Sequence, residues 1–173
     1  MHVLFVCTGN VCRSPTAERL AVAYAEELGI TNLTAESAGT AAVAGESMEA
    51  TAAQVLEGLG GDPNEFSAQP LTADLAAEAD LVLTMTEDHR DQVLALAPDQ
   101  VEKTFTLKEA ARLAEVAGAK TVEDLASARP RHESNGSPED IPDPIGQDEE
   151  TYLNVGSEIA DLLGVIARGV RAA

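Results

Sequence analysis

Apolar residues along the chain form two kinds of pattern, short continuous runs and longer stretches with helical spacing. Continuous runs such as DLVLTM at 80–85 predict strands of a parallel sheet, because such strands are buried on both faces. The predicted strands cover residues 3–6, 33–37, 80–85 and 101–107. Apolar residues that recur at helical spacing predict helices over residues 15–28, 48–59, 87–96, 107–126 and 152–170.

The boundaries of the first helix follow from its flanking residues. Pro15 suits the first helical position, and Ser14 suits the N-cap before it, since a serine hydroxyl accepts from a free backbone N–H. Gly29 is expected to end this helix, as glycine readily adopts the conformation that stops one.

The alternation of strands and helices predicts the fold class. Each helical crossover must return over the sheet, so the strands run parallel and helices cover both faces. We therefore expect a single three-layer α/β domain over residues 1–173, with a four-stranded parallel sheet. Residues 129–142, rich in proline and charge, are expected to form a flexible loop or a lid.

Composition fits one globular domain and argues against some partners. The chain has 173 residues, of which 45% are hydrophobic and 24% charged. Acidic residues number 30 against 11 basic ones, a formal charge of −19. Such a surface repels phosphate groups, so we expect neither nucleic acid nor a membrane as a partner. The sequence does not define an oligomeric state.

The cysteines and histidines argue for a reducing compartment and against a metal site. Cys7 and Cys12 lie close together, whereas a disulfide scaffold spreads its cysteines through the chain. No run reaches the ~18 apolar residues of a membrane span, and the apolar start is too short for a secretory signal. We therefore expect a cytoplasmic protein. The histidines His2, His89 and His132 match no zinc spacing, so no metal or other cofactor is expected.

The segment 7–14, between the first predicted strand and the first helix, carries the candidate chemistry. In open parallel sheets, ligands bind where strands end and helix N-termini point. Five residues separate Cys7 from Arg13, enough for a curled loop whose backbone N–H groups bind an anion. Gly9 and Asn10 suit the left-handed conformations that such a curl requires. The expected phosphate-binding residues are Thr8, Gly9, Asn10, Val11, Cys12, Arg13 and Ser14.

Three side chains of this loop would act on a bound phosphate. Arg13 would hold two phosphate oxygens with its planar guanidinium. The N–H dipoles and the guanidinium would favour a nucleophilic thiolate at Cys7, and Ser14 can donate its hydroxyl to that sulfur. Taken alone, this spacing also arises by chance, and a cysteine that ends a strand is commonly a small buried hydrophobic residue.

Residues 7–15 (CTGNVCRSP) resemble the signature of the low-molecular-weight protein tyrosine phosphatases. The resemblance continues at residues 37–40 (SAGT), 71–72 (LT), 79–86 (ADLVLTMT), 105–109 (FTLKE) and 143–146 (DPIG). It covers nearly the whole chain in the family's order. It is closest to the bacterial branch that also includes protein arginine phosphatases.

The resemblance implies a metal-independent phosphatase that acts on phosphorylated proteins in two steps. Cys7 would attack phosphorus while Arg13 and the loop hold its oxygens. Asp143 would protonate the leaving oxygen and then activate the water that hydrolyses the phosphocysteine. Asp140 is the weaker alternative for this acid.

The resemblance also assigns supporting roles. Asn10, Ser14 and Ser37 would form a hydrogen-bond network that holds the loop, although Asn10 also suits an ordinary turn and Ser37 a strand end.

Mild peroxide is expected to join Cys7 and Cys12 in a reversible disulfide. The alternative is that Cys12 only fills space beneath the loop.

Departures from the family pattern concern the substrate. Family members that act on phosphotyrosine often carry aromatic residues in two places, where this chain has 40–43 (TAAV) and Ile145-Gly146. Phe66 stands near where many members have histidine. The arginine phosphatases carry threonine at the position of Val11. The missing hydroxyl favours phosphotyrosine over phosphoarginine as the substrate.

Two other functions stay open at this point. A related branch reduces arsenate with cysteines far downstream, but no cysteine follows Cys12, which leaves only reduction coupled to a small thiol. The non-enzyme alternative is a module that binds phosphoproteins. Cys7, Arg13 and a candidate acid argue against it, because binding alone needs no thiol.

Overall fold

The computed structural model describes residues 1–170 and shows one parallel sheet. Its strands are β1 (His2–Cys7), β2 (Thr34–Gly39), β3 (Leu81–Thr84) and β4 (Thr104–Thr106). They lie in the order β2-β1-β3-β4, with Cys7 opposite Gly39 and Val6 opposite Thr84. Because all four run the same way, their carboxyl ends share one edge of the sheet, where the loop 7–14 begins.

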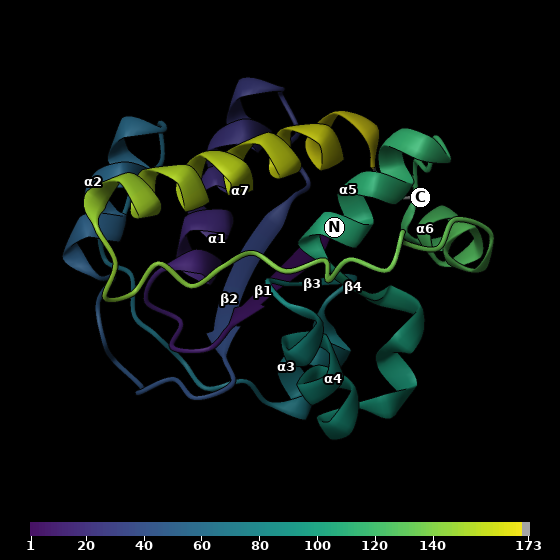
Figure 1. Ribbon diagram of the computed structural model, residues 1–173, viewed down its shortest axis with the longest axis horizontal. Coiled ribbons are helices and arrows are strands. Elements are labelled where there is room, and N and C mark those ends of the chain that lie inside the picture. Colours follow the sequence, from purple (N-terminus) through teal and green to yellow (C-terminus); the bar gives the residue numbers. More distant parts are fainter. Residues whose placement is uncertain (171–173) are drawn as a thin grey trace.

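Helices cover both faces of this sheet (Figure 1). They are α1 (Arg13–Glu27), α2 (Ala50–Gly58), α3 (Ala73–Glu78), α4 (Glu87–Leu96), α5 (Leu107–Val116), α6 (Val122–Ala128) and α7 (Glu149–Gly169), with short 3-10 turns η1 (Pro98–Lys103) and η2 (Arg129–Arg131). Successive strand residues point to opposite faces. Phe5 and Phe105 pack under α1, α5 and α7, whereas Leu4 and Val82 pack under α3 and α4. The predicted three-layer α/β fold is confirmed.

The start of α1 differs from its prediction. The helix begins at Arg13, so Pro15 is its third residue, and Cys12 occupies the N-cap position without a side-chain cap. Ser14 is therefore not the N-cap. Its Oγ lies 2.9 Å from Cys7 Sγ, which is the other contact expected for this hydroxyl.

Further differences lie between β2 and α7. Residues 101–103, predicted as strand, belong to η1, because Pro98 opens a helical turn there. The helical stretch predicted over 107–126 is two helices, and Thr121 caps the second. Helix α3, capped by Thr72, was not predicted, since six residues are too few to show a period.

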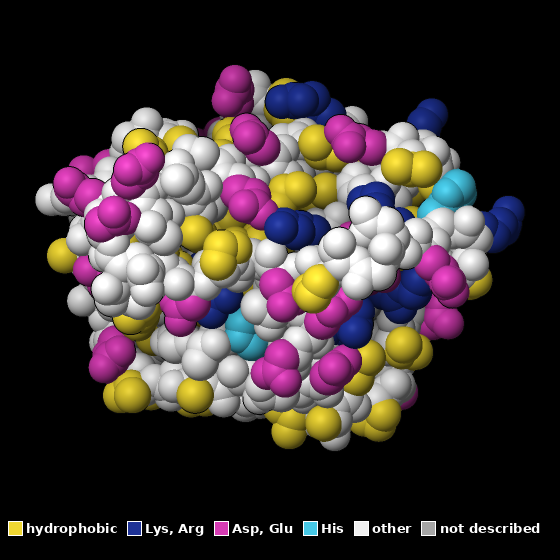
Figure 2. All heavy atoms as spheres, viewed as in Figure 1, with side chains coloured by type: hydrophobic (Ala, Val, Ile, Leu, Met, Phe, Trp, Pro, Cys, Tyr) yellow, Lys and Arg dark blue, Asp and Glu magenta, His cyan; other side chains and the backbone are white. Residues whose placement is uncertain are grey.

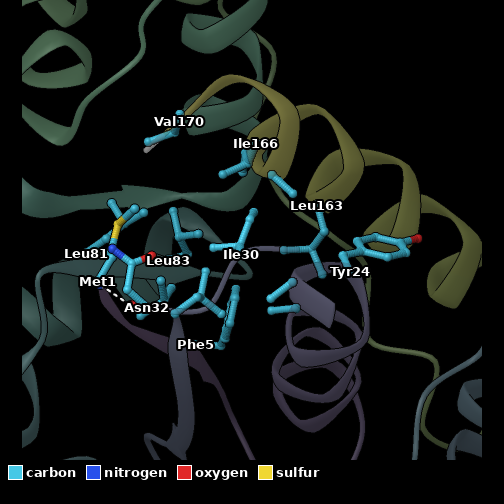
Figure 3. A pocket seen from close by; sticks show the side chains of 15 residues that line it. Met1, Phe5, Tyr24, Ile30, Asn32, Leu81, Leu83, Leu163, Ile166 and Val170 are labelled. Carbon is cyan, nitrogen blue, oxygen red and sulfur yellow. Dashed lines mark hydrogen bonds between the residues drawn. The ribbon is translucent and has the colours of Figure 1, made fainter. Parts of the chain in front are cut away.

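A small apolar pocket lies at the amino ends of the strands, away from the loop 7–14 (Figure 3). It has a volume of about 50 Å³, and Phe5, Tyr24, Leu83 and Leu163 are among the side chains that line it. On the face seen in Figure 2, acidic side chains are scattered rather than gathered in one patch. Within residues 1–170, no helix is both long and apolar enough to cross a membrane.

Candidate active site

The loop between β1 and α1 turns its carbonyl oxygens away from its centre. Those of Cys7 and Thr8 accept hydrogen bonds from the two residues that follow β2 (2.9 Å each), and that of Val11 accepts from Glu49 N–H (2.8 Å). Within the described part of the chain, the backbone N–H groups of residues 8–14 donate to no protein acceptor. The loop thus leaves free N–H donors at the start of α1, as an anion-binding ring requires.

Two residues allow the loop to curl so tightly. Asn10 adopts a left-handed conformation with φ 57°, whereas Gly9, which was also expected to do so, does not. Gly39 lies against the loop, and a Cβ on it would stand 2.4 Å from the Thr8 carbonyl oxygen. Glycine is therefore required at position 39 for the close approach of β2.

Hydrogen bonds from Asn10 hold the loop from inside. Its Nδ2 donates to Ser14 Oγ (2.8 Å) and to Ser37 Oγ (2.9 Å), and all three side chains are buried. The structure therefore brings together the three residues predicted to support the loop. The network extends beyond that prediction: Gln69 N–H donates to Asn10 Oδ1 (2.9 Å), and Ser37 donates to Glu18 (2.8 Å).

The candidate nucleophile and the candidate cation lie together at this ring. Cys7, at the carboxyl end of β1, is buried, and its Sγ contacts Ser14 Oγ at 2.9 Å. Arg13 is 4% exposed, and its Nη1 donates to the Ile141 carbonyl (2.8 Å). Its Nη2 lies 3.7 Å from Asp143 Oδ2.

The two candidate acids have different surroundings. The Asp143 side chain is 50% exposed and approaches Arg13, and its Oδ1 accepts from Ile145 N–H (3.1 Å). Asp140 Oδ1 instead accepts from Glu87 N–H (2.8 Å) at the start of α4. Asp140 is therefore occupied in a structural contact, which favours Asp143 as the acid that faces a bound phosphate.

His89, on the first turn of α4, supports the loop from its outer side and was not predicted in this role. Its Nε2 lies 2.8 Å from Thr8 Oγ1, while its buried Nδ1 has no hydrogen-bond partner within the described residues. Burial, and then the nearby Arg13, lower the pKa of His89 to about 4, against the opposing effect of Asp88. The imidazole is therefore neutral at physiological pH.

We expect His89 to make the protein less stable in acid. Its pKa falls from 6.5 when unfolded to about 4 when folded, so the unfolded chain binds the proton first as the pH falls. Up to about 3 kcal/mol of stability should be lost between about pH 6.5 and pH 4. Urea unfolding at several pH values gives the free energy of unfolding as a function of pH. This free energy should fall less between pH 6.5 and pH 4 for His89→Gln than for wild type. His132→Gln is the control, and the same pH dependence in both variants would contradict the assignment.

Cys12 lies beneath the loop, against Tyr152 and Ile159. Burial, and then the nearby Cys7, raise the pKa of its thiol to about 12, so it is protonated at physiological pH. We expect mild peroxide to inactivate the protein through a Cys7–Cys12 disulfide that added thiol reverses. Peptide mapping should find the bond. Full recovery of a Cys12→Ser variant after the same treatment would show that Cys12 is only structural.

The fold and the site together define a class of protein. A strand-end cysteine that is followed by a loop with free backbone N–H groups, with an arginine and an aspartate beside that loop, is an arrangement suited to phosphate chemistry. Among residues 1–170, no group of side chains is placed to hold a metal ion.

The chain belongs to the low-molecular-weight phosphotyrosine protein phosphatase family, whose model matches residues 2–124. It is 32% identical to a protein-arginine-phosphatase of Bacillus subtilis over 171 residues, 99% of this chain and 97% of that protein. It is 41% identical to the probable low molecular weight protein-tyrosine-phosphatase AmsI of Erwinia amylovora over 103 residues, 60% of this chain and 68% of that protein.

Solved structures agree with this family assignment. A YwlE arginine phosphatase with serine in place of cysteine and a phosphorylated active-site serine superposes with a TM-score of 0.78 and 32% identity, covering 97% of this chain and 94% of that one. The low molecular weight protein tyrosine phosphatase of T. tengcongensis gives 0.78 and 31%, covering 97% and 98%. The predicted family and enzyme class, a phosphatase, are confirmed.

Proposed function

We propose that this enzyme removes phosphate from phosphorylated proteins through a phosphocysteine intermediate on Cys7. The observation that carries the proposal is that, within residues 1–170, the backbone N–H groups of residues 8–14 have no protein acceptor, in the loop that directly follows Cys7 at the end of β1. The phosphorylated active-site serine in the related arginine phosphatase variant supports a covalent intermediate on this side chain.

In the first step, the Cys7 thiolate attacks phosphorus opposite the leaving group. An S–P bond forms, the P–O bond to the substrate breaks, and Asp143 gives its proton to the departing oxygen or nitrogen. Arg13 and the loop N–H groups stabilise the negative charge on the three remaining phosphoryl oxygens. The Ser14 hydroxyl, 2.9 Å from the sulfur, stabilises the thiolate.

In the second step, water hydrolyses the phosphocysteine. Asp143, now ionised, accepts a proton from the water as its oxygen attacks phosphorus. The S–P bond breaks, inorganic phosphate forms and the Cys7 thiolate is restored. All of these groups belong to the chain itself, so the mechanism requires no cofactor.

Hydrolysis of p-nitrophenyl phosphate tests this function. We expect turnover that orthovanadate blocks, because vanadate occupies the ring as a phosphate analogue. A protein that binds phosphate without turnover would be the binding module instead. Arsenate reduction with a small thiol, at a rate above that of hydrolysis, would support the reductase alternative.

For the substrate side chain, we propose phosphotyrosine ahead of phosphoarginine. Val11, half-buried on the loop near Gly9, offers no hydroxyl to a guanidinium. Val43 and Ile145, which stand where phosphotyrosine-specific family members often carry aromatic residues, are exposed and aliphatic, so they offer no ring face on which a phenyl group could stack. The loss of stacking weakens phosphotyrosine binding by roughly 0.5–1.5 kcal/mol, so we expect a high KM.

Phosphoarginine is the second candidate, and the extent of similarity favours it. The arginine phosphatases of B. subtilis and Geobacillus stearothermophilus match 99% and 96% of this chain, whereas the tyrosine phosphatase AmsI matches 60%. The acidic surface would also attract basic segments that carry phosphoarginine, although salt screens this attraction beyond about 8 Å.

Val11→Thr decides between the two substrates. We expect the wild-type enzyme to have a larger kcat/KM for phosphotyrosine than for phosphoarginine. The variant should shift the ratio toward phosphoarginine by about tenfold, the effect of one hydrogen bond to a charged group. Val11→Ala is the control, because it changes size without adding a hydroxyl. A wild-type preference for phosphoarginine would overturn the proposal, and an equal shift in both variants would remove its stated cause.

A further inference from the structure

The chain just before Asp143 is anchored at three consecutive residues. We call residues 139–143 the strap; in Figure 1 it belongs to the green segment between α6 and α7. Glu139 pairs with Arg112 on α5, and Asp140 accepts from the first N–H of α4. Ile141 is fully buried, and its N–H donates to the carbonyl that follows β3 (2.8 Å). The strap is thereby tied to three different elements of the fold.

The Arg112–Glu139 contact is the strongest of these anchors. The guanidinium Nε and Nη2 each lie 3.0 Å from a different oxygen of the carboxylate, and Nη1 donates to the His132 carbonyl. The Glu139 carboxylate is 15% exposed, so water screens the pair little. The Glu139 hydrogen bond raises the pKa of Arg112, so its guanidinium stays charged over the working pH range.

The strap leads directly to both groups that act on phosphate. The Ile141 carbonyl accepts from Arg13 Nη1 (2.8 Å), and Asp143 follows two residues later. The Asp143 carboxylate itself has little to hold it, because it is half-exposed and lies 3.7 Å from Arg13. Among the described residues, its one hydrogen-bond donor is the N–H of Ile145 in the same loop. Its position relative to Cys7 therefore depends on where the strap holds its backbone.

We propose that Arg112, through its ion pair with Glu139, is a positioning residue for the general acid. This inference rests on the proposed role of Asp143. Arg112 touches neither phosphate nor sulfur; it holds the strap so that the Asp143 carboxyl reaches the leaving atom. Without the pair, the loop 7–14 and Arg13 still bind phosphate, but proton delivery fails in most encounters.

Helix α5 also offers a matched control. Lys108 Nζ lies 2.9 Å from Glu158 Oε1 on α7, an ion pair that is more exposed than Arg112–Glu139 and does not touch the strap. Lys108→Met therefore removes one ion pair from the same helix as Arg112→Met does. A general loss of stability would lower the activity of both variants, whereas misplacement of the acid would lower that of Arg112→Met alone.

The test compares kcat/KM for phenyl phosphate with that for p-nitrophenyl phosphate, because only the poorer leaving group needs the acid. We expect Arg112→Met to lower the phenyl/p-nitrophenyl ratio at least about tenfold, with the inhibition constant of inorganic phosphate within about threefold of wild type. Lys108→Met should leave the ratio unchanged. Glu139→Gln should reproduce the effect, and Arg112→Lys, which keeps the charge, should show a smaller one.

Asp143→Asn separates failure of this inference from failure of the proposed acid. If Asp143→Asn lowers the ratio, and Arg112→Met lowers it no further in that background, the two residues act in one step. If Asp143→Asn lowers the ratio and Arg112→Met and Glu139→Gln do not, the positioning role is wrong while the acid stands. If Asp143→Asn leaves the ratio unchanged, the proposed acid itself is wrong. If Arg112→Met raises the inhibition constant of phosphate as much as it lowers the ratio, the substitution acts through Arg13 and phosphate binding, and the inference is overturned.

Discussion

Cys7→Ser is expected to abolish turnover, lowering kcat by at least about 10³-fold, while phosphate affinity stays within about tenfold of wild type. The serine hydroxyl occupies nearly the same space as the thiol but is a far weaker nucleophile at neutral pH. The ring of N–H groups at residues 8–14 and the Arg13 guanidinium are unchanged, so the anion still binds. Covalent attack and anion binding are thus carried by different groups.

Two measurements on one preparation check this separation. Hydrolysis of p-nitrophenyl phosphate gives kcat, and calorimetry with inorganic phosphate gives the dissociation constant. Turnover in Cys7→Ser comparable to wild type would contradict the nucleophile assignment. A loss of turnover together with phosphate affinity would instead mean that the substitution had disrupted the loop.

Asp143→Asn is expected to lower kcat/KM for phenyl phosphate by about 10²–10⁴-fold, with a much smaller loss for p-nitrophenyl phosphate. The p-nitrophenolate ion leaves without a proton, whereas phenolate is a poor leaving group that needs one. Asparagine keeps the side-chain oxygen that accepts from Ile145 N–H, so the loop geometry is retained.

Asp140→Asn is the matched control for this prediction. Asparagine at position 140 still accepts from Glu87 N–H at the start of α4, so only the acidic proton is removed. We expect almost no change in its dependence on the leaving group. If Asp140→Asn shows the selective loss and Asp143→Asn does not, then Asp140 is the acid and the assignment must be exchanged.

The chemistry of the loop could be predicted because its residues are consecutive. Cys7, Arg13 and the residues between them share one short segment, and the left-handed conformation of Asn10 follows from its own side chain. Ser14 shows both the reach and the limit of such local reasoning. The sequence suggested two uses for its hydroxyl, a cap on the helix and a contact with the Cys7 sulfur, and the structure has the second, with the two atoms 2.9 Å apart.

The contacts that complete the site were out of reach of any local pattern. The carbonyl that holds Arg13 comes from Ile141, 128 residues further along the chain. His89 and Arg112 belong to helices whose sequence periodicity indicates which residues are buried but not which distant groups they meet.

By itself, the sequence determined the parallel α/β fold and the tightly curled loop after β1, because short-range spacing and side-chain type control these features. Only the tertiary structure decided the rest: that Asp140 accepts from the first N–H of α4 while Asp143 approaches Arg13, and that Arg112 anchors the strap. The physical reason is that these contacts depend on how helices on both faces of the sheet pack at its carboxyl edge. That packing is set by the summed burial of the whole core rather than by any local segment.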